Sequence, residues 1–432
     1  MTLTRDPDTR TAALADAIVA GDPVHAHLQV IGFGPGGLGI PVAADRLGLL
    51  DRLMSRGLAL VDKRPAWRWD GLSYGINSNS EAHDFLAFIR PDGFFGPLLD
   101  TPEGRAVRAY GKQRIPLTLV ASFLRLAAER FLDHLAEHNR SAVICGRSVA
   151  TLEIARDGLF LSRDADGLPI ARSSHAVLAL GAEEQMRPDL EPLVAPARRA
   201  GRLIASESLL RGLTEDRIGA ALAAGAPIAV IGSSHSAFSV VDYLLQSYPE
   251  RLRDGQVVVV TKHRPKIYFT SAGEAEAQLV DLSAQTLDQP TGEINKFDGL
   301  RGDARQVYCD IAAGTERRAR LMRLEHAGTP AVIEAAGLVV QAVGYGPRRL
   351  PVVDADGRPV DLAYGPSNIA IDDDCTVLRT DGRPVPRLYA VGLGHAMADR
   401  SPDGAQRGYK VGVNFFHGSA GARIVEQLGL EE

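Results

Sequence analysis

The residues most suited to bind a ligand come directly after the first apolar run of the chain. Gly32, Gly34 and Gly37 stand at the G-x-G-x-x-G spacing, and Pro35 and Gly36 complete the turn. At this spacing the first glycine permits a tight turn, the second lets the backbone approach a pyrophosphate, and the third lets the next helix pack closely on the strand. Free N–H groups at the start of that helix favour negative charge. The stretch therefore predicts a turn that binds the diphosphate of a dinucleotide.

An acid follows at the end of the next apolar run. Residues 58–61 read as a strand, and Asp62 and Lys63 come directly after it. A carboxylate at this place is suited to hydrogen-bond the ribose of an adenine nucleotide. The alternative is a glycine-rich turn that binds nothing, but the order of strand, glycines, helix, strand and acid favours a dinucleotide site. We count Asp62 and Lys63 among the candidate cofactor ligands.

The same pattern returns in a degraded form in the middle of the chain. An apolar run over residues 228–231 ends at Gly232, and Ser234 and Ala237 stand where the second and third glycines would be. Small residues still allow close approach, so we interpret this stretch as a second nucleotide-binding turn. Its candidate ligands are Gly232, Ser233, Ser234, His235 and Ser236. His235 could contact a phosphate or a nicotinamide, although a lone histidine is more often a structural donor.

Cations, and not an acid, follow the second strand of this second unit. Residues 257–260 read as a strand, and Lys262 and Arg264 come just after it. An acid at this place would select the free 2′-hydroxyl of NAD, whereas cations suit the 2′-phosphate of NADP. The alternative is a solvated basic loop. The position at the end of a strand favours NADP.

Three further apolar runs predict how the chain returns to its sheets. Residues 176–180 run into Gly181, residues 338–343 run into Gly344 and Tyr345, and a last strand leads to Gly392. We take these four residues as candidate cofactor contacts. The order of the runs indicates an α/β fold with two Rossmann-like dinucleotide-binding domains, the second inserted into the first.

Smaller elements can be predicted from periodicity. Residues 117–138 keep apolar side chains on one helical face, and residues 150–154 and 159–162 alternate as a β-hairpin does. Residues 268–310 show no clear period, and residues 331–333 read as a short strand.

Composition excludes several classes of protein. The chain has 432 residues and a formal net charge of −5, so no basic balance points to nucleic acid. Its three cysteines are far apart and form no C-x-x-C pair, and the histidines show no metal-ligand spacing. The start of the chain reads as no signal peptide, and no apolar stretch is long enough to span a membrane. We therefore expect a cytoplasmic protein with no metal and no membrane contact.

Several of these residues together resemble the class B flavin monooxygenases that hydroxylate the side-chain amine of ornithine, lysine or related amines. The resemblance rests on the first glycine motif with Leu38, on residues 69–72 followed by residues 85–86, on the linker 201–206, and on the return run 342–345. In that family the stretch that begins at Trp69 lies beside the flavin. The resemblance implies a flavin domain over 27–200 and 336–432, an NADP domain over 201–335, and an N-terminal arm over 1–26.

Three departures concern the substrate and the cofactor. Ala205 stands where the family linker carries a histidine, and Ala87 stands where the ornithine enzymes place a lysine facing the amino acid. Residues 391–418 also lack the family's usual pattern. Ornithine or lysine is therefore not implied as the substrate.

The resemblance implies an enzyme that binds FAD and NADPH and uses O₂ to hydroxylate a primary amine through a C4a-hydroperoxyflavin. Asn77 and Asn79 are candidate catalytic amide donors toward the flavin ring or the nicotinamide, although the composition around them favours turn residues. The partners would be O₂ and a small-molecule amine, and the oligomeric state stays open, a homo-oligomer included. Two alternatives share the scaffold. One is another NAD(P)H-dependent flavoprotein, either a reductase or an enzyme that oxygenates sulfur or a carbonyl, and the other is a non-catalytic redox sensor.

Overall fold

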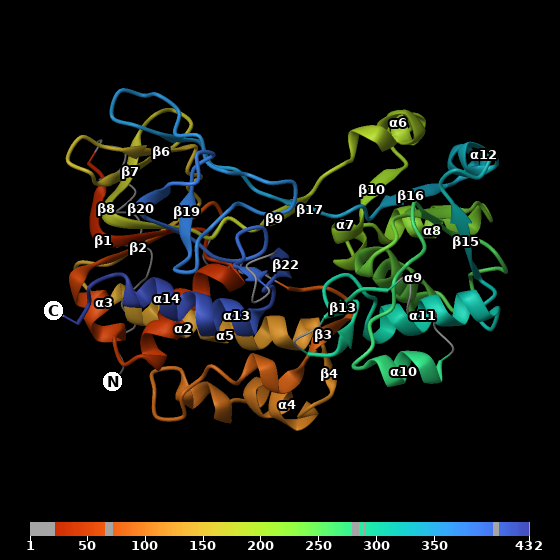
Figure 1. The fold of residues 1–432 in the computed structure, drawn as a ribbon, viewed down its shortest axis with the longest axis horizontal. Helices are drawn as coiled ribbons and strands as arrows, with labels where there is room; N and C mark the ends of the chain where they lie inside the picture. The colour runs from red at the N-terminus through yellow and green to blue at the C-terminus, as the bar shows by residue number, and fades with distance from the viewer. Residues whose placement is uncertain (1–21, 65–71, 279–284, 289–290, 401–405, 432) are drawn as a thin grey trace.

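The computed structural model describes residues 22–64, 72–278, 285–288, 291–400 and 406–431. Figure 1 shows two halves side by side, each built on one large sheet with helices packed against it. The predicted α/β fold with two nested Rossmann-like domains is confirmed. Most of the expected N-terminal arm lies outside the described residues, and the first strand already begins at Val24.

The sheet of the first half contains nine strands among the described residues, with β1 (Val24–Ile31) at its centre. β1 pairs in parallel with β2 (Leu58–Asp62) on one side and with β8 (Pro169–Leu178) on the other. Every residue of β2 is buried, as expected for a parallel strand covered on both faces. The other strands are β5 (Ala142–Cys145), β6 (Thr151–Ile154), β7 (Phe160–Arg163), β18 (Val352–Val353), β19 (Thr376–Leu378) and β20 (Pro384–Ala390).

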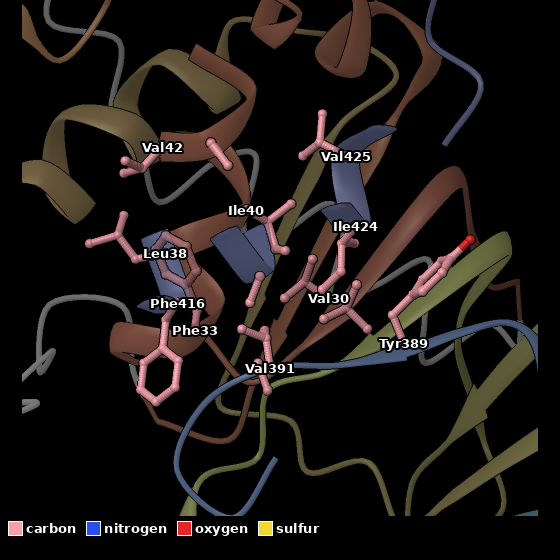
Figure 2. Close-up of a cluster of buried hydrophobic side chains, with 14 of the residues drawn as sticks. Val30, Phe33, Leu38, Ile40, Val42, Tyr389, Val391, Phe416, Ile424 and Val425 are labelled. Atoms are coloured by element: carbon pink, nitrogen blue, oxygen red, sulfur yellow. The ribbon is translucent and has the colours of Figure 1, made fainter. Parts of the chain in front are cut away.

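The helices of this half bring the last residues of the chain onto the first glycine motif. They are α2 (Pro35–Arg46), α3 (Leu50–Arg56), α4 (Pro102–Tyr110), α5 (Leu117–Ala136), α13 (Val413–Phe415), a π-helical turn (Phe416–Ala420) and α14 (Gly421–Glu426). A Cβ on Gly39 would lie 2.6 Å from the Phe416 carbonyl oxygen, so only glycine allows this approach. Figure 2 shows the apolar core beneath it, where Ile40 and Val30 meet Ile424. None of the helices in the described part is long and apolar enough to cross a membrane.

The second half is built on a parallel sheet in the order β10-β16-β11-β12-β15. Its strands are β10 (Leu203–Ala205), β11 (Ile228–Ile231), β12 (Val257–Thr261), β15 (Ala319–Arg323) and β16 (Leu338–Gln341). Its helices are α6 (Glu191–Arg199), α7 (Ser206–Leu210), α8 (Glu215–Ala223), α9 (His235–Ser247), α10 (Ala272–Ala277), α11 (Gly302–Ala313) and α12 (Thr329–Ala335). β11, β12 and β16 are buried along their whole lengths, which explains their unbroken apolar sequences.

The chain crosses between the halves twice. The crossings are β9 (Ala182–Glu184) and β17 (Tyr345–Pro347), which pair as a two-stranded antiparallel ribbon. β16 belongs to the second sheet, although the expected boundary after residue 335 had assigned it to the flavin domain. We therefore propose that the inserted domain ends after Ala342, where the second crossing begins.

Three short antiparallel pairs complete the fold. They are β3 (Asn77–Glu81) with β4 (Arg114–Pro116), β13 (Leu287–Asp288) with β14 (Glu293–Ile294), and β21 (Ala398–Arg400) with β22 (Gln406–Tyr409). In Figure 1 the labels of β3, β4, β13 and β22 lie between the two halves.

Two of the smaller predictions are wrong, and two are confirmed. Residues 331–333 belong to helix α12, because a run of three apolar residues cannot show whether the period is that of a strand or a helix. The stretch 268–310, expected to be irregular, contains α10, β13, β14 and most of α11. The long amphipathic helix is α5, and the hairpin is β6 with β7.

Candidate active site

The first glycine turn lies where ligands bind in sheets of this kind. β2 and β8 leave β1 on opposite sides, so the carboxyl end of β1 is a topological switch point. Gly32 has φ +98°, and a Cβ there would lie 2.4 Å from the Ala179 carbonyl oxygen. A Cβ on Gly37 would lie 2.2 Å from the Gly32 carbonyl oxygen. Both glycines are therefore required by the backbone itself.

The two glycines between them differ in their surroundings, because Gly34 has an open face and Gly36 lies against Gly392. A Cβ on Gly34 would meet only the Arg64 guanidinium, at 3.7 Å, so its free face can take a ligand. A Cβ on Gly36 would lie 3.0 Å from the Cα of Gly392, which brings the loop after β20 against the turn. Pro35 begins helix α2 and its carbonyl accepts a hydrogen bond from His417 Nε2 at 2.7 Å.

Asp62 is held by the turn and by a residue that the sequence analysis missed. Its Oδ2 accepts the Phe33 backbone N–H at 2.6 Å, and Arg64 binds both carboxylate oxygens, with Nε 3.1 Å from Oδ1 and Nη2 3.0 Å from Oδ2. Burial alone would raise the pKa of Asp62, but the hydrogen bonds and charge of Arg64 hold it below its ordinary value. A ribose hydroxyl would reach this carboxylate only if the Arg64 side chain moves. Lys63 is exposed.

These residues fit an adenine dinucleotide such as FAD. The free face of Gly34, the helix N-terminus at Pro35 and the ionised Asp62 match a diphosphate followed by a ribose. His395, three residues after Gly392, is fully buried, and its Nε2 has no hydrogen-bond partner within the described residues. A buried polar atom of this kind needs a partner, and a bound cofactor could supply one.

We expect the protein to lose stability as the pH falls below about 6.5, with the two fully buried histidines, His395 and His417, among the causes. Burial lowers the pKa of each to about 4, from 6.5. Because the folded pKa is below the unfolded one, the stabilising contribution is complete above the unfolded value and is lost as the pH falls toward the folded value. At about pH 5.5 the loss is about 1.4 kcal/mol per histidine.

The measurement is the urea midpoint of the holoprotein at about pH 7.5 and about pH 5.5. The variant His417→Gln keeps an N–H for the Pro35 carbonyl but removes one titrating group, so its midpoint should shift less. Equal midpoints for the wild type at both pH values would contradict this account.

The second glycine turn repeats the first bond for bond. The same two backbone hydrogen bonds, N–H to carbonyl, frame both turns. They are Gly32 to Val61 (2.8 Å) and Ala179 to Ile31 (2.9 Å) in the first, and Gly232 to Val260 (3.0 Å) and Ala342 to Ile231 (2.8 Å) in the second. A Cβ on Gly232 would lie 2.2 Å from the Ala342 carbonyl oxygen, as tightly placed as in the first turn. The degraded motif therefore keeps the backbone geometry of the first turn.

His235 begins helix α9 beside Ser233, Ser234 and Ser236. Its Nε2 accepts the Arg301 backbone N–H at 3.0 Å. Burial, and next the charge of Arg301, lower the pKa of His235 to about 4, so the imidazole is neutral near pH 7. One ring nitrogen of His235 thus accepts a hydrogen bond from the residue just before α11. Contact of His235 with a cofactor stays a prediction.

The predicted cations lie at the carboxyl edge of the second sheet. Lys262 follows β12, and its Nζ lies 3.1 Å from Asp189 Oδ2. Arg264 is exposed. Arg323, at the end of β15, donates to the Lys262 carbonyl at 2.8 Å and adds a third cation that the sequence analysis did not name. Arg323 lies beside Thr261 because β12 and β15 pair in parallel, and this pairing cannot be read from the local sequence.

The return motifs meet in the ribbon between the halves. Gly181 and Gly344 have φ +74° and +112°, and Tyr345 lies opposite Glu184. Glu184 accepts the Ser206 backbone N–H at 2.8 Å and its hydroxyl. Burial raises the pKa of Glu184, although the hydrogen bonds from Ser206 and Tyr345 oppose it. Burial and the neighbouring Glu184 also raise the pKa of Tyr345. This ribbon joins the two halves. Contact of Gly181, Gly344 or Tyr345 with a cofactor stays a prediction.

The two predicted catalytic amides lie on one exposed face of β3. Asn77 Nδ2 donates to Asp303 Oδ2 of the other half at 2.9 Å. Asn79 is exposed on the same face. Asn77 therefore joins the halves, and the catalytic role of both residues stays a prediction. Trp69 lies outside the described residues.

The sequence was compared with family models and with curated proteins. No family model matches the chain. The CMP-5′-(3-aminopropyl)phosphonate hydroxylase of Streptomyces rubellomurinus is 28% identical over 426 residues, which are 94% of this chain and 97% of that protein. This likeness supports the resemblance to class B flavin monooxygenases of the N-hydroxylating type.

Solved structures share the fold of this protein over almost the whole chain. The ornithine hydroxylase of Pseudomonas aeruginosa is 15% identical, with 95% of this chain and 100% of that chain covered and a TM-score of 0.60. The cadaverine monooxygenase of the desferrioxamine pathway from Erwinia amylovora, solved with bound FAD, is 13% identical, with 93% and 94% covered and a TM-score of 0.58. The named hydroxylase among the relatives supports the prediction of an enzyme, and the interpretation as a non-catalytic sensor is not supported.

Proposed function

We propose that this protein is a flavin monooxygenase that converts a primary amine of a small molecule to a hydroxylamine. The amine, O₂, NADPH and a proton give the hydroxylamine, NADP⁺ and water. The observation that supports this proposal is the pair of equivalent glycine turns, each at the switch point of its own sheet. Two dinucleotides can be bound at once, as a reaction between a flavin and a nicotinamide requires.

FAD, when bound, supplies the oxygen chemistry. In our proposal the first turn holds its diphosphate through the backbone at Gly34 and Pro35, and Asp62 holds its ribose after Arg64 moves. Gly392 closes the turn from the other side. The second turn holds NADPH, with Lys262 and Arg264 near its 2′-phosphate.

The substrate we propose carries its amine at the end of a short alkyl chain. The names of the relatives support this class: one acts on an aminopropylphosphonate that is attached to CMP, and others on ornithine and cadaverine. The exposed Ala87 stands where the ornithine enzymes place a lysine, and alanine offers no charge to an amino-acid carboxylate. We therefore favour an aminoalkylphosphonate, free or as its nucleotide ester, over ornithine.

The test is a panel of amines given to the purified holoenzyme with NADPH. It contains 3-aminopropylphosphonate, its CMP ester, ornithine, lysine and cadaverine. We expect a hydroxylamine by mass spectrometry and little hydrogen peroxide with at least one of the phosphonates. If every amine leaves NADPH consumption matched by peroxide, the proposal fails.

We also propose that the enzyme works in the cytoplasm, where NADPH is supplied. Its cysteines, Cys145, Cys309 and Cys375, are free thiols, as expected in a reducing compartment. Burial raises the pKa of each, which keeps the thiols protonated and unreactive.

A further inference from the structure

One segment of the NADP half contacts two separate parts of the flavin half. We call residues 296–303, which follow β14 and include the first two residues of α11, the clasp. Asp303, in the clasp, accepts Arg114 Nη1 on Oδ1 at 2.6 Å and Asn77 Nδ2 on Oδ2 at 2.9 Å. Both donors lie on the β3–β4 pair, which Figure 1 places between the halves and away from the β9–β17 ribbon.

The other end of the clasp contacts the last hairpin of the flavin half. A Cβ on Gly408, in β22, would lie 2.5 Å from the Phe297 ring. The ring thus packs directly on the hairpin backbone, and glycine makes room for it. β21 begins six residues after Gly392, beside the first glycine turn. The clasp therefore contacts two separate elements of the flavin half, the β3–β4 pair and the β21–β22 hairpin.

The clasp is also joined to the second nucleotide turn. The Arg301 backbone N–H donates to Nε2 of His235, the first residue of α9. Gly302 follows with φ +57°, and a Cβ there would lie 2.3 Å from Arg114 Nη1. The guanidinium of Arg301 lies 3.6 Å from the centre of the Tyr268 ring. Residues 301–303 thus connect the turn that would hold NADPH, through His235, to the contact between the halves, through Asp303.

We propose that the clasp closes the NADP half onto the flavin half when the second turn is occupied, with Asp303 as its positioning residue. Closure keeps NADP⁺ bound after it has given up its hydride, so that the site stays shielded from water until oxygen transfer is complete. This inference rests on the proposed function.

The strength of the contact suits a reversible closure. The Asp303 and Arg114 side chains are 29% and 39% exposed, so solvent screens part of their attraction. Such a pair, with one added hydrogen bond from Asn77, can bias an equilibrium about tenfold without fixing it permanently. A clasp that must open in each cycle needs a bias of that size.

A charge-swap experiment on the holoenzyme tests the clasp. Asp303→Arg and Arg114→Asp each place two like charges at the contact, and the double variant restores opposite charges. We expect each single variant to bind NADP⁺ about tenfold more weakly and to release a larger share of NADPH electrons as hydrogen peroxide, and the double variant to recover most of both losses. NADP⁺ affinity is measured by titration of the oxidised holoenzyme.

The matched control is Asp298→Arg. Asp298 lies in the clasp as well, but its partner is Lys266 of the same half, at 2.7 Å. This variant should bind NADP⁺ as the wild type does. Unchanged NADP⁺ affinity in both single variants, or a double variant no better than the singles, would overturn the inference. The NADP⁺ titration needs no amine, so a wrong substrate class leaves this test intact.

Discussion

Gly34→Val is expected to give a folded protein that has lost at least nine-tenths of its FAD, about a tenfold effect on occupancy. A Cβ at Gly34 meets only the Arg64 guanidinium, at 3.7 Å, and φ is −90°, so the apoprotein has room for the side chain. The two methyl groups of valine would fill the space into which the diphosphate must come. The measurement is the flavin absorbance per mole of purified protein.

The choice of glycine makes this experiment diagnostic. Gly37→Ala would place its Cβ 2.2 Å from the Gly32 carbonyl oxygen, so a loss of FAD there could come from misfolding alone. Gly219→Val is the matched control, because Gly219 lies on α8 and a Cβ there would meet nothing within 4 Å among the described residues. Gly34→Val protein that is as yellow as the control would contradict the assignment of the first turn to FAD.

Lys262→Ala combined with Arg264→Ala is expected to weaken the use of NADPH about a hundredfold and to leave NADH unchanged. A charge-assisted hydrogen bond to phosphate contributes about 1.5–3 kcal/mol, so each cation accounts for about a factor of ten or more. Loss of Lys262 also removes one of the two cations that bind Asp189 and leaves it paired with Arg187. The measurement is kcat/KM for flavin reduction with each nucleotide.

Lys266→Ala serves as the control for this pair. Lys266 is a cation of the same half, but it binds Asp298 and follows β12 at a greater distance. Lys266→Ala should leave kcat/KM for flavin reduction unchanged with both NADPH and NADH. If the double variant lost NADH and NADPH to the same extent, the cations would be supporting the loop and not reading the phosphate.

The two nucleotide turns were predictable because glycine spacing fixes local backbone geometry. A Cβ at Gly32 or at Gly232 would lie within 2.4 Å of a carbonyl oxygen, so only glycine fits at either position. The spacing of small residues around each glycine is therefore visible in the sequence. The apolar runs that return to the sheets were predictable for a similar reason, since buried parallel strands need unbroken apolar residues.

Contacts between residues far apart in the chain could not be predicted in this way. Asn77 and Asp303 are separated by 226 positions, and neither local sequence indicates that they pair. The amide of Asn77 looked free for a flavin or a nicotinamide because its local sequence is that of a turn. Arg64 is different, because a cation two residues after Asp62 is a local signal that could have been used.

Labelling with oxygen-18 gas tests the central claim most directly. The holoenzyme is given NADPH, labelled O₂ and the amine that performs best in the panel, and the hydroxylamine is analysed by mass spectrometry. The account predicts one labelled oxygen atom in each product molecule and one NADPH consumed for each. Unlabelled product, or labelled peroxide in place of any hydroxylamine, would contradict a monooxygenase and leave a reductase or oxidase on the same fold.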